Sequence, residues 1–327
     1  MYNWIRYSTA ILLGSLSLSA YGQPQTFTQY VQGLRQEFLE QGYSKAVVST
    51  AFDGVRLRPQ AIQRDKNQPE FRLTLDSYIP RALPQWKVDK ARNLYKEHLP
   101  LLKTIAKKYG VQPRFIVALW GVESNFGKLT GQYDVMSALT SLAYQGRREA
   151  FFKRQIGDVL SMLEEDNITR DQLKGSWAGA MGQVQFMPGT YREYAVDQDQ
   201  DGKKDIWNDI PDALASAANY LQHLNWHDNM TWGRQVRLPT SLDLNTLDLK
   251  QTRSLVQWQA LGVRRYNGQD LPQRDMQARL LVPDDLKGRI YLVYDNFESL
   301  LKWNRSNYFA ITVGILANQI GYPPIKE

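Results

Sequence analysis

The sequence predicts a mainly α (α+β) protein that carries one small β-rich insert late in the chain. Apolar residues recur at helical spacing near the start, at Phe27, Val31, Leu34 and Phe38. Residues 236–295 instead carry closely spaced turn signals around short apolar runs, a pattern typical of strands. In a chain of 327 residues, a hydrophobic content of 43% is enough for a substantial core.

The first 22 residues have the composition of a secretory signal peptide. Arg6 gives a short positive flank, residues 8–19 are apolar or small, and Ala20-Tyr21-Gly22 predicts cleavage before Gln23. The alternative is an uncleaved anchor, but the stretch is short and serine-rich for a membrane span. We therefore expect an exported protein without a stable membrane anchor.

The absence of cysteine and the net charge limit the expected cellular location and the expected type of partner. The chain has no cysteine, which excludes disulfides, thiolate metal sites, thiol nucleophiles and a lipidated cysteine, so we expect a periplasmic protein that is not a lipoprotein. The 40 basic residues exceed the 33 acidic ones, giving a net charge of +7. Because the basic residues are dispersed, the pattern does not favour nucleic acid, whereas an anionic polymer is a reasonable partner.

Helices are expected through most of the remaining chain. Residues 85–109 repeat the helical pattern and end in a basic turn before Gly110, and further helices are expected at 148–165, 211–224 and 296–321. Within the insert, the runs Ala278–Val282 and Arg289–Val293 are expected strands. These patterns divide the chain into a helical part at 23–95, a helical core at 96–235, the insert at 236–295, and helices at 296–327 that complete the core.

Glu123 is the most informative single residue. Pro113 suits the first turn of a helix, the stretch from Phe115 to Trp120 is apolar, and Gly127 is a natural helix end. Glu123 would then be a lone carboxylate in the last turn of a buried helix. Desolvation and the helix dipole both disfavour its charge there, so its pKa should rise and make it a general acid. The alternative is an ordinary carboxylate that reaches solvent where the helix emerges.

A second segment, Gly175–Pro188, mixes small residues with aromatic and amide side chains. Ala178, Gly179, Ala180 and Gly182 allow close approach of a backbone or a ligand. The interleaved aromatic, amide and thioether side chains offer stacking faces and hydrogen bonds; they are Trp177, Gln183, Gln185, Phe186 and Met187. This mixture suits the wall of a sugar-binding cleft. The alternative is a tightly packed pair of helices.

Residues 197–205 match a calcium-binding EF-hand loop through its ninth position. Acids occupy positions 1, 3, 5 and 9, Gly202 occupies position 6, and the Lys203 carbonyl is available at position 7. Position 12 is Asn208, where a bidentate glutamate belongs. The alternative is a turn in which the aspartates cap their own backbone.

Together these segments closely resemble the lytic murein transglycosylase B family, soluble relatives of lysozyme that cleave bacterial peptidoglycan. Five segments carry the resemblance in family order: Gly121–Gly127, Gly146–Arg148, Ser176–Pro188, Ala217–Leu221 and Trp303–Ser306. The resemblance implies a lysozyme-like helical catalytic core. It also implies a lytic transglycosylase, which cleaves the β-1,4 bond between N-acetylmuramic acid and N-acetylglucosamine without water and leaves 1,6-anhydromuramic acid ends.

The resemblance also implies roles for individual residues. Glu123 would be the catalytic acid and base, no cofactor would take part in the chemistry, and a structural Ca²⁺ would bind at 197–212 with Asp212 as the closing acid. The expected metal ligands are Asp197, Asp199, Asp201, Lys203, Asp205 and Asp212. The expected substrate-binding residues are Ser124, Arg147, Arg148, Ser176, Gln185, Phe186, Met187, Tyr78, Tyr220 and Asn304. The family often has Tyr where Trp303 stands, which preserves stacking but puts hydrogen bonding from that position in doubt.

No second acid lies in either central motif, and Asp134 is expected to cap the helix that begins near Val135. A single acid fits a reaction in which the C6 hydroxyl of muramic acid attacks its own C1, as the family resemblance implies. Two other functions remain: a hydrolytic lysozyme of goose type, and a non-catalytic peptidoglycan-binding protein. We expect a monomer that acts on glycan strands, with other cell-wall enzymes as further partners.

Overall fold

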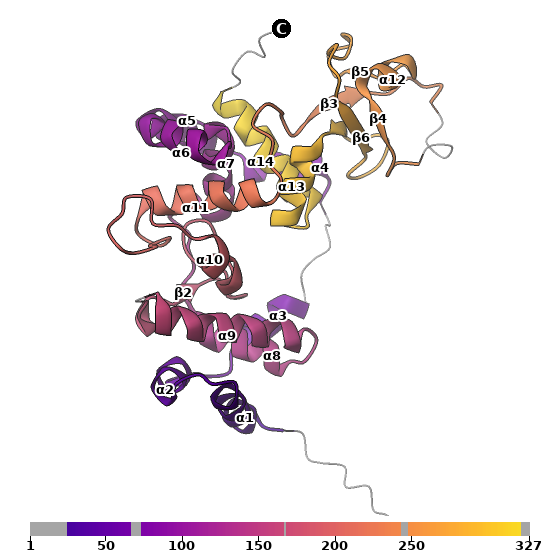
Figure 1. Ribbon diagram of the computed structural model, residues 1–327. Helices are drawn as coiled ribbons and strands as arrows, with labels where there is room; N and C mark the ends of the chain where they lie inside the picture. The colour runs from indigo at the N-terminus through magenta and orange to yellow at the C-terminus, as the bar shows by residue number, and fades with distance from the viewer. Residues whose placement is uncertain (1–24, 67–72, 167, 243–247, 322–327) are drawn as a thin grey trace, which may run out of the picture.

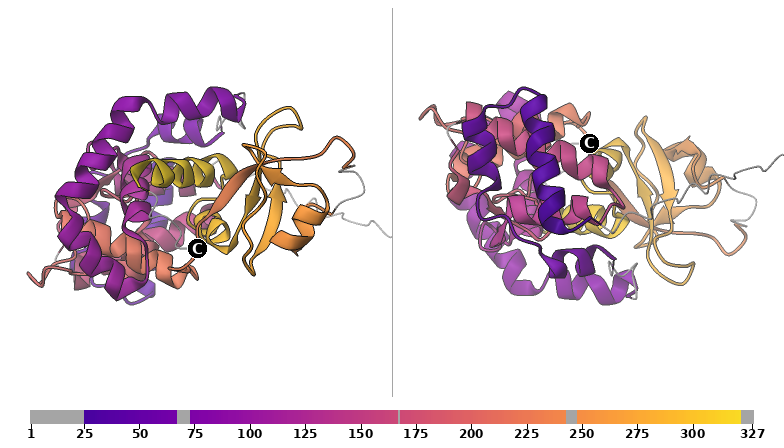
Figure 2. Two further views of the ribbon diagram at one scale, coloured as in Figure 1. Left: turned by 90° about the horizontal axis from the view of Figure 1, so that it is seen from above. Right: turned by 90° about the horizontal axis from the view of Figure 1, so that it is seen from below.

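The computed structural model describes residues 25–66, 73–166, 168–242 and 248–321 of the chain (Figure 1). The expected signal peptide lies outside these residues. Helices form most of the described chain, and a small sheet projects from one side of the helical body (Figure 2). The predicted fold class, mainly helical with a small β insert, is confirmed.

The first six helices precede the segment that holds Glu123. They are α1 (Phe27–Glu40), α2 (Lys45–Phe52), α3 (Pro59–Lys66), α4 (Leu75–Ala82), α5 (Gln85–Glu97) and α6 (Leu99–Tyr109). Helix α1 begins with a capping box, in which Thr26 and Gln29 satisfy each other's backbone N–H groups. Helix α6 ends at Gly110, whose φ of 66° is the left-handed conformation that glycine adopts without steric cost.

The seventh helix is α7 (Pro113–Ser124), and six further helices of the helical body follow it in the described chain. They are α8 (Val135–Tyr144), α9 (Glu149–Glu165), α10 (Pro188–Tyr194), α11 (Ile210–His223), α13 (Asp295–Trp303) and α14 (Asn307–Ile320). Helix α7 packs most extensively against α14, and α10 and α11 lie between the helices around α7 and the pair α8–α9 (Figure 1). As predicted, Asp134 caps α8, where its carboxylate accepts a hydrogen bond from the Ser137 backbone at 2.9 Å.

Two sheets complete the described structure. The smaller pairs β1 (Tyr133–Asp134) with β2 (Lys174–Gly175), and a single turn of 3₁₀ helix at Arg170–Gln172 precedes β2. The larger is antiparallel, with strand order β4-β6-β7-β3-β5. Its strands are β3 (Gly233–Arg237), β4 (Thr252–Ser254), β5 (Arg264–Arg265), β6 (Gln277–Leu281) and β7 (Ile290–Val293), with the short helix α12 (Leu255–Ala260).

The buried apolar side chains form three clusters. One joins α4–α7, α11, α13 and α14; the second joins α1, α2, α8, α9 and the segment around Phe186; the third lies within the larger sheet and α12. Trp303 is partly buried and packs against both the first and the second cluster. The end of α13 therefore lies where the two helical cores meet.

Candidate active site

Helix α7 places Glu123 at its carboxyl end. Pro113 occupies the first turn, as predicted, and every residue from Arg114 to Gly121 is buried. The helix ends at Ser124 rather than at Gly127, because Asn125 already adopts a left-handed conformation with φ 52°. Phe126 and Gly127 continue at φ 60° and 75°. Such conformations are costly for residues other than glycine, and they often mark functional sites.

Phe126 turns its ring back under the helix. A Cβ atom at Gly121 would lie 2.6 Å from that ring, so the ring fits only because position 121 is glycine. The Phe126 ring also meets the indole of Trp120 edge-on, with 5.7 Å between centroids. These contacts fix the chain direction directly after Glu123.

The Glu123 carboxyl has one hydrogen-bond donor among the described residues. Trp303 Nε1 donates to Glu123 Oε1 at 2.6 Å, across 180 positions of sequence. Burial raises the pKa of Glu123 to about 7, although the hydrogen bond from Trp303 acts in the opposite direction. The structure thus supplies the hydrogen bond that the sequence had put in doubt, and it leaves Glu123 substantially protonated near neutral pH.

An aromatic cluster surrounds Trp303. Its ring lies 5.6 Å from that of Phe186 and 5.0 Å from that of Tyr220, centroid to centroid. Tyr220 in turn stacks on Tyr194 at 4.6 Å. Phe186 is only 2% exposed, so it supports the indole from behind rather than forming an open surface. Tyr194 was not predicted from the sequence; its position on the inner side of α10 became clear only from the packing.

The segment predicted as a cleft wall is a tight double turn and not a pair of helices. Isolated bridges pair Met181 with both Gly175 and Phe186. Gln185 adopts a φ of 53° and donates its amide to the backbone oxygens of Thr130 at 3.1 Å and Gly182 at 2.9 Å. No donor among the described residues reaches its Oε1, which is therefore the atom available to a ligand.

Ser176 and Met187 lie at the two ends of this turn. The Ser176 hydroxyl accepts hydrogen bonds from the backbone N–H groups of Ala178 at 3.3 Å and Ala180 at 3.1 Å, so its own proton is available to an acceptor. Met187 is partly exposed and precedes α10. Inside the turn, Trp120 Nε1 donates to Gln183 Oε1 at 2.9 Å. This buried bond ties α7 to the turn.

Ser124 does not have the exposed position that a substrate contact requires. The residue is fully buried, and its hydroxyl accepts from Gly127 N at 2.8 Å and donates to Trp120 O at 3.3 Å. The substrate contact predicted for Ser124 is therefore corrected to a structural role. It closes the end of α7 and so supports Glu123.

Arg147 and Arg148 both bind the carboxylate of Asp65. Each places its Nη2 atom 2.6 Å from a different oxygen of Asp65, which is 2% exposed. The two side chains remain 55% and 45% exposed, so their outer N–H groups still face solvent. No described contact joins them to Glu123. The two arginines therefore form a positively charged surface, held in place by Asp65, beside the core that contains α8 and α9.

Tyr78 and Asn304 are the remaining predicted substrate residues. Tyr78 meets Tyr308 edge-on at 5.2 Å, between α4 and α14. Asn304 is exposed and ends α13 directly after Trp303. Asn304 therefore adjoins the Glu123 site through the chain, whereas the described contacts of Tyr78 do not reach it.

Asp134, the nearest second acid in sequence, is already engaged. It caps α8 and forms an ion pair with Arg170. Burial alone would raise the pKa of Asp134, but the contacts with Arg170 and Ser137 outweigh burial and hold it below its ordinary value. A carboxylate with a lowered pKa and occupied oxygens is poorly suited to activate a water molecule.

The predicted calcium loop gathers three carboxylates. Oxygen atoms of Asp197, Asp199 and Asp212 lie within 4.8 Å of one another. Asp212 is buried and accepts hydrogen bonds from Gln198 N at 2.6 Å and Asp205 N at 2.8 Å. Burial, reinforced by neighbouring acids, raises its pKa to about 6. Clustered carboxylate oxygens of this kind fit Ca²⁺, which would offset their mutual repulsion.

The other predicted ligands are less well placed. Asp201 accepts a hydrogen bond from Lys203 N at 2.9 Å, and Asp205 accepts from the backbones of Trp207 and Asn208, each at 2.9 Å. Neither carboxylate belongs to the three-acid cluster. Lys203 could contribute only its carbonyl oxygen.

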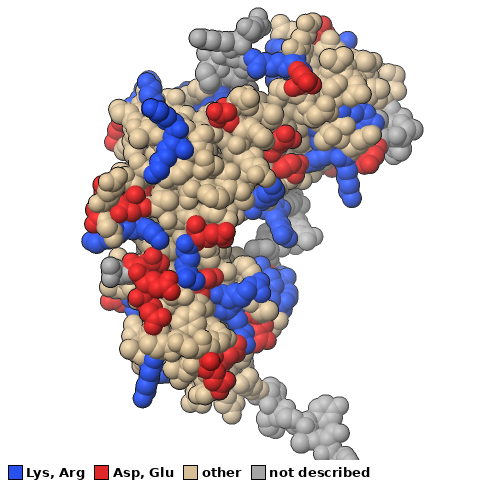
Figure 3. All heavy atoms as spheres, viewed as in Figure 1, with Lys and Arg blue, Asp and Glu red and all other residues tan. Residues whose placement is uncertain are grey.

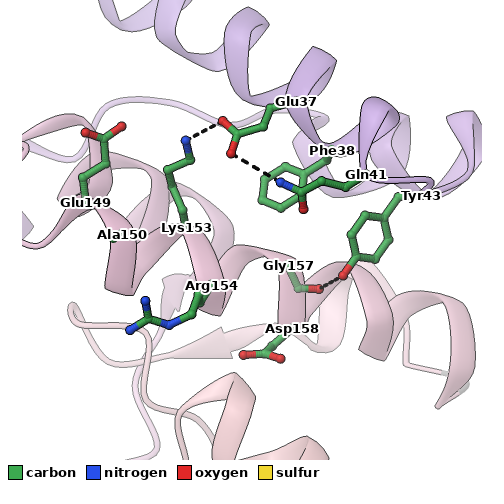
Figure 4. Close-up of a pocket in the computed structure, with 10 residues that line it drawn as sticks. All are labelled: Glu37, Phe38, Gln41, Tyr43, Glu149, Ala150, Lys153, Arg154, Gly157 and Asp158. Atoms are coloured by element: carbon green, nitrogen blue, oxygen red, sulfur yellow. Dashed lines mark hydrogen bonds and ion pairs between the residues drawn. The ribbon is translucent and has the colours of Figure 1, made fainter.

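A groove of about 730 Å³ lies between α1 and α9, away from Glu123 (Figure 4). Its charged groups are largely paired within the protein: Glu37 bonds to Lys153 and Gln41, and the Tyr43 hydroxyl donates to Gly157 O at 3.1 Å. On the face seen in Figure 3, basic and acidic side chains are interspersed. No helix among the described residues is long and apolar enough to cross a membrane.

Comparison with known proteins gives consistent results. Residues 26–318 match the family described as the transglycosylase SLT domain. Membrane-bound lytic murein transglycosylase B of Escherichia coli K12 is 32% identical over 229 residues, which are 67% of this chain and 59% of that protein. The chain thus matches less than two thirds of this relative's length.

Two solved structures are similar over most of the chain. SltB3 from Pseudomonas aeruginosa, in complex with NAG-anhNAM-pentapeptide, has a TM-score of 0.86 and 39% identity, covering 90% of this chain and 80% of that one. The Escherichia coli lytic transglycosylase Slt35, in complex with calcium, has a TM-score of 0.77 and 25% identity, covering 89% and 92%.

Proposed function

This chain belongs to the transglycosylase SLT-domain family, and on that premise we propose that it is a peptidoglycan lytic transglycosylase. It would cleave the β-1,4 bond between N-acetylmuramic acid and N-acetylglucosamine without water and leave 1,6-anhydromuramic acid ends. The observation that carries the proposal is Glu123, a carboxyl group with a pKa of about 7 that a single hydrogen bond holds at the end of a buried helix.

In the first step, protonated Glu123 acts as a general acid. It gives its proton to the glycosidic oxygen as the bond from that oxygen to C1 of muramic acid breaks. In the second step, the C6 hydroxyl of the same sugar attacks C1, and Glu123 takes up the hydroxyl proton. The carboxyl ends protonated, as it began, so one residue serves both steps and no water is consumed.

Among the residues that the structure describes, no second acid with free oxygens contacts the Glu123 site, which supports this reaction over hydrolysis. An inverting or retaining hydrolase needs a second carboxylate beside the scissile bond. Asp134, the candidate in sequence, is bound to Arg170 and to the first turn of α8. The relative SltB3 binds a fragment that contains the anhydro sugar. Intramolecular attack also avoids the entropic cost of recruiting a separate nucleophile.

The surrounding residues would hold the glycan strand. We assign the free acceptor of Gln185 and the free proton of Ser176 to acetamido groups, and Tyr220 and Met187 to contacts with the sugar faces. Arg147 and Arg148 would meet peptide carboxylates with the N–H groups that Asp65 leaves exposed, and Asn304 would close the site beside Trp303.

A Ca²⁺ held by Asp197, Asp199 and Asp212 would stabilise the fold. The periplasm, where the polymer lies, would be the place of action.

Replacement of Glu123 tests this function. We expect Glu123→Gln to lower the turnover of purified peptidoglycan by at least about 10²-fold, because the amide has a similar shape but cannot deliver a proton. Glu40→Gln, at an exposed position on α1, is the matched control and should retain full activity. Near-normal turnover by a folded Glu123→Gln protein would remove this residue from catalysis.

Mass spectrometry of the wild-type digest identifies the reaction. Released muropeptides should be lighter by one water than hydrolysis products, and borohydride should leave their muramic acid ends unchanged. Predominantly reducible ends would make the protein a hydrolase.

A further inference from the structure

The Glu123 carboxyl is bound asymmetrically. Trp303 Nε1 donates to Oε1 at 2.6 Å, while no donor or acceptor among the described residues reaches Oε2. The indole has little freedom to turn away, because Phe186 and Tyr220 pack against its ring at 5.6 and 5.0 Å. The two oxygens of one carboxyl group therefore have different surroundings.

The chemistry of the indole donor maintains the difference between the two oxygens when Glu123 is ionised and when it is protonated. An indole N–H can donate a hydrogen bond but cannot accept one, whereas the hydroxyl of a tyrosine can do both. When Glu123 is ionised, Oε1 accepts from Trp303. When Glu123 is protonated, its carbonyl-type oxygen is the better acceptor, and a proton on Oε1 would weaken the bond from the indole N–H. The bond keeps its full strength in both states when the proton resides on Oε2.

We propose that Trp303 is a positioning residue that fixes the roles of the two Glu123 oxygens, holding Oε1 throughout the reaction and confining the proton to Oε2. The inference rests on the proposed function. In the first step, the Oε2–H bond breaks, the glycosidic oxygen gains the proton, and its bond to C1 breaks. In the second step, the C6 oxygen bonds to C1 and its proton passes to Oε2. The same atom gives and regains the proton, so the carboxyl need not rotate between steps.

Other titratable groups near the site must be separated from Glu123 in any test. Tyr220 and Tyr194 lie beyond the indole, and the pKa of each is raised, for Tyr220 chiefly by burial and for Tyr194 chiefly by the hydrogen bond to Glu193. On the other side of α7, Lys90 lies over the Phe126 ring, Lys128 follows in the next loop, and His98 packs on Trp120. The test therefore needs a control that removes only Glu123.

Indole resonances in ¹⁵N–¹H NMR spectra provide a direct test. The chain has nine tryptophans, and the resonance missing in Trp303→Phe identifies Trp303. We expect this resonance to titrate with a midpoint near 7, the pKa of Glu123, and to keep the shift of a hydrogen-bonded N–H on both sides. The indole of Trp258, which donates to Ala278 O at 2.9 Å in the distant sheet, is the matched control and should not titrate.

The Glu123→Gln protein shows which group causes the titration. Its side-chain amide oxygen can still accept from Trp303, so the resonance should stay in place and stop titrating. A titration that persists in this variant would assign the effect to another group and overturn the proposal. Loss of the hydrogen-bonded shift at low pH in the wild-type protein would also overturn it, because the proton would then compete for Oε1.

The pH profile of kcat/KM adds a readout that a purely structural role would not move. Trp303→Phe keeps an aromatic ring but removes the donor that lowers the pKa of Glu123. We expect the alkaline limb to move upward by about one to two pH units, and kcat to fall by roughly 10–100-fold with little change in KM. Trp303→Tyr restores a donor and should move the limb back. An unmoved limb in folded Trp303→Phe would reduce Trp303 to a packing residue.

The two proposals fail separately. An active Glu123→Gln protein contradicts the proposed function, whatever the indole does. An inactive Glu123→Gln protein together with a flat wild-type Trp303 resonance contradicts only the positioning role. The NMR titration requires no turnover and no substitution at Trp303 beyond the assignment.

Discussion

Glu123 imposes a pH-dependent cost on the folded protein. Its pKa is raised by burial from 4.5 to about 7, so the folded state holds a proton that the unfolded state has already released between these values. Stability from this residue is fully present below pH 4.5, is lost as the pH rises toward 7, and changes little above that. The raised pKa thus gives the site a group that can donate a proton near neutral pH, and it lowers the stability of the folded protein at alkaline pH.

Removing the carboxyl should therefore stabilise the protein at high pH. At pH 8, we expect the free energy of unfolding of Glu123→Gln to exceed that of the wild type by about 1–3 kcal/mol. The variant should therefore unfold at a higher denaturant concentration. The difference should shrink toward pH 4.5, where both forms are neutral. Urea titrations across this range measure it. A constant difference at every pH would show that Glu123 does not have the raised pKa.

For single residues, the sequence predicted the roles that depend on the residue's own helix. It did not predict the roles that depend on a partner far away in the sequence. The pKa rise of Glu123 and the cap formed by Asp134 follow from helix ends, which local spacing shows. The bond from Trp303 crosses 180 positions, and that of Arg148 to Asp65 crosses 83. No local pattern contains such pairs, and the burial of Ser124 likewise depends on the turn that packs over it.

Elements with a regular or continuous apolar pattern were predictable, whereas the turn at Gly175–Phe186 was not. Helix α9 spans Glu149–Glu165, and strand β7 spans Ile290–Val293, each within one residue of the predicted range at either end. The turn has no such periodicity. It is held by bridges at Met181 and by positive φ at Gly179, Gly182 and Gln185, so glycine spacing alone could not determine its path.

Gly131 tests how tightly this turn is held against the loop after Glu123. A Cβ there would lie 2.1 Å from the backbone oxygen of Gly175, and the φ of 90° disfavours any other residue. We expect Gly131→Ala to destabilise the protein by roughly 3 kcal/mol or more and to lower activity. Gly42, with φ 97° and no atom within 4 Å, is the matched control. Gly42→Ala should cost only about 1–2 kcal/mol; equal costs in chemical denaturation would contradict the close packing.

The acidic loop makes a separate prediction. We expect Ca²⁺ to raise the melting temperature and chelator to lower it, because a ligand of the folded state alone stabilises by about 2.7 kcal/mol at 100-fold excess over Kd. Asp197→Asn with Asp199→Asn should abolish the response, while Asp171→Asn, an exposed acid outside the loop, should not. Identical wild-type melts with Ca²⁺ and chelator would instead favour the self-capped turn.

Over the whole molecule, polar contacts join the insert to the helical body. Asp284, in the turn between β6 and β7, accepts from Leu75 N at 2.8 Å and from the Tyr308 hydroxyl, and Arg289 donates to Asp76 at 2.6 Å. These bonds connect the sheet to α4 and α14; α4 packs against α14, and α14 packs against α7. The insert therefore supports the core that carries Glu123, although none of its residues reaches the carboxyl through a described contact.

Breaking this connection should loosen α4 first. We expect Asp284→Ala to lower stability by about 1–3 kcal/mol and to speed amide hydrogen exchange in α4 more than in α9. Asp285 hydrogen-bonds only within its own turn, to the backbones of Lys287 and Gly288, and Asp285→Ala is the matched control. Unchanged exchange in α4 would show that the bonds of Asp284 do not hold α4 to the insert.

The bond between positions 123 and 303 also has a consequence for incomplete chains. A ribosome must deliver nearly the whole polypeptide before the carboxyl meets its indole, and the two helical cores must close on each other before that contact is stable. Nascent, truncated or half-folded chains carry the carboxyl group without the hydrogen bond from Trp303. For the lytic transglycosylase proposed above, wall-cleaving chemistry would therefore begin only in a finished, folded molecule.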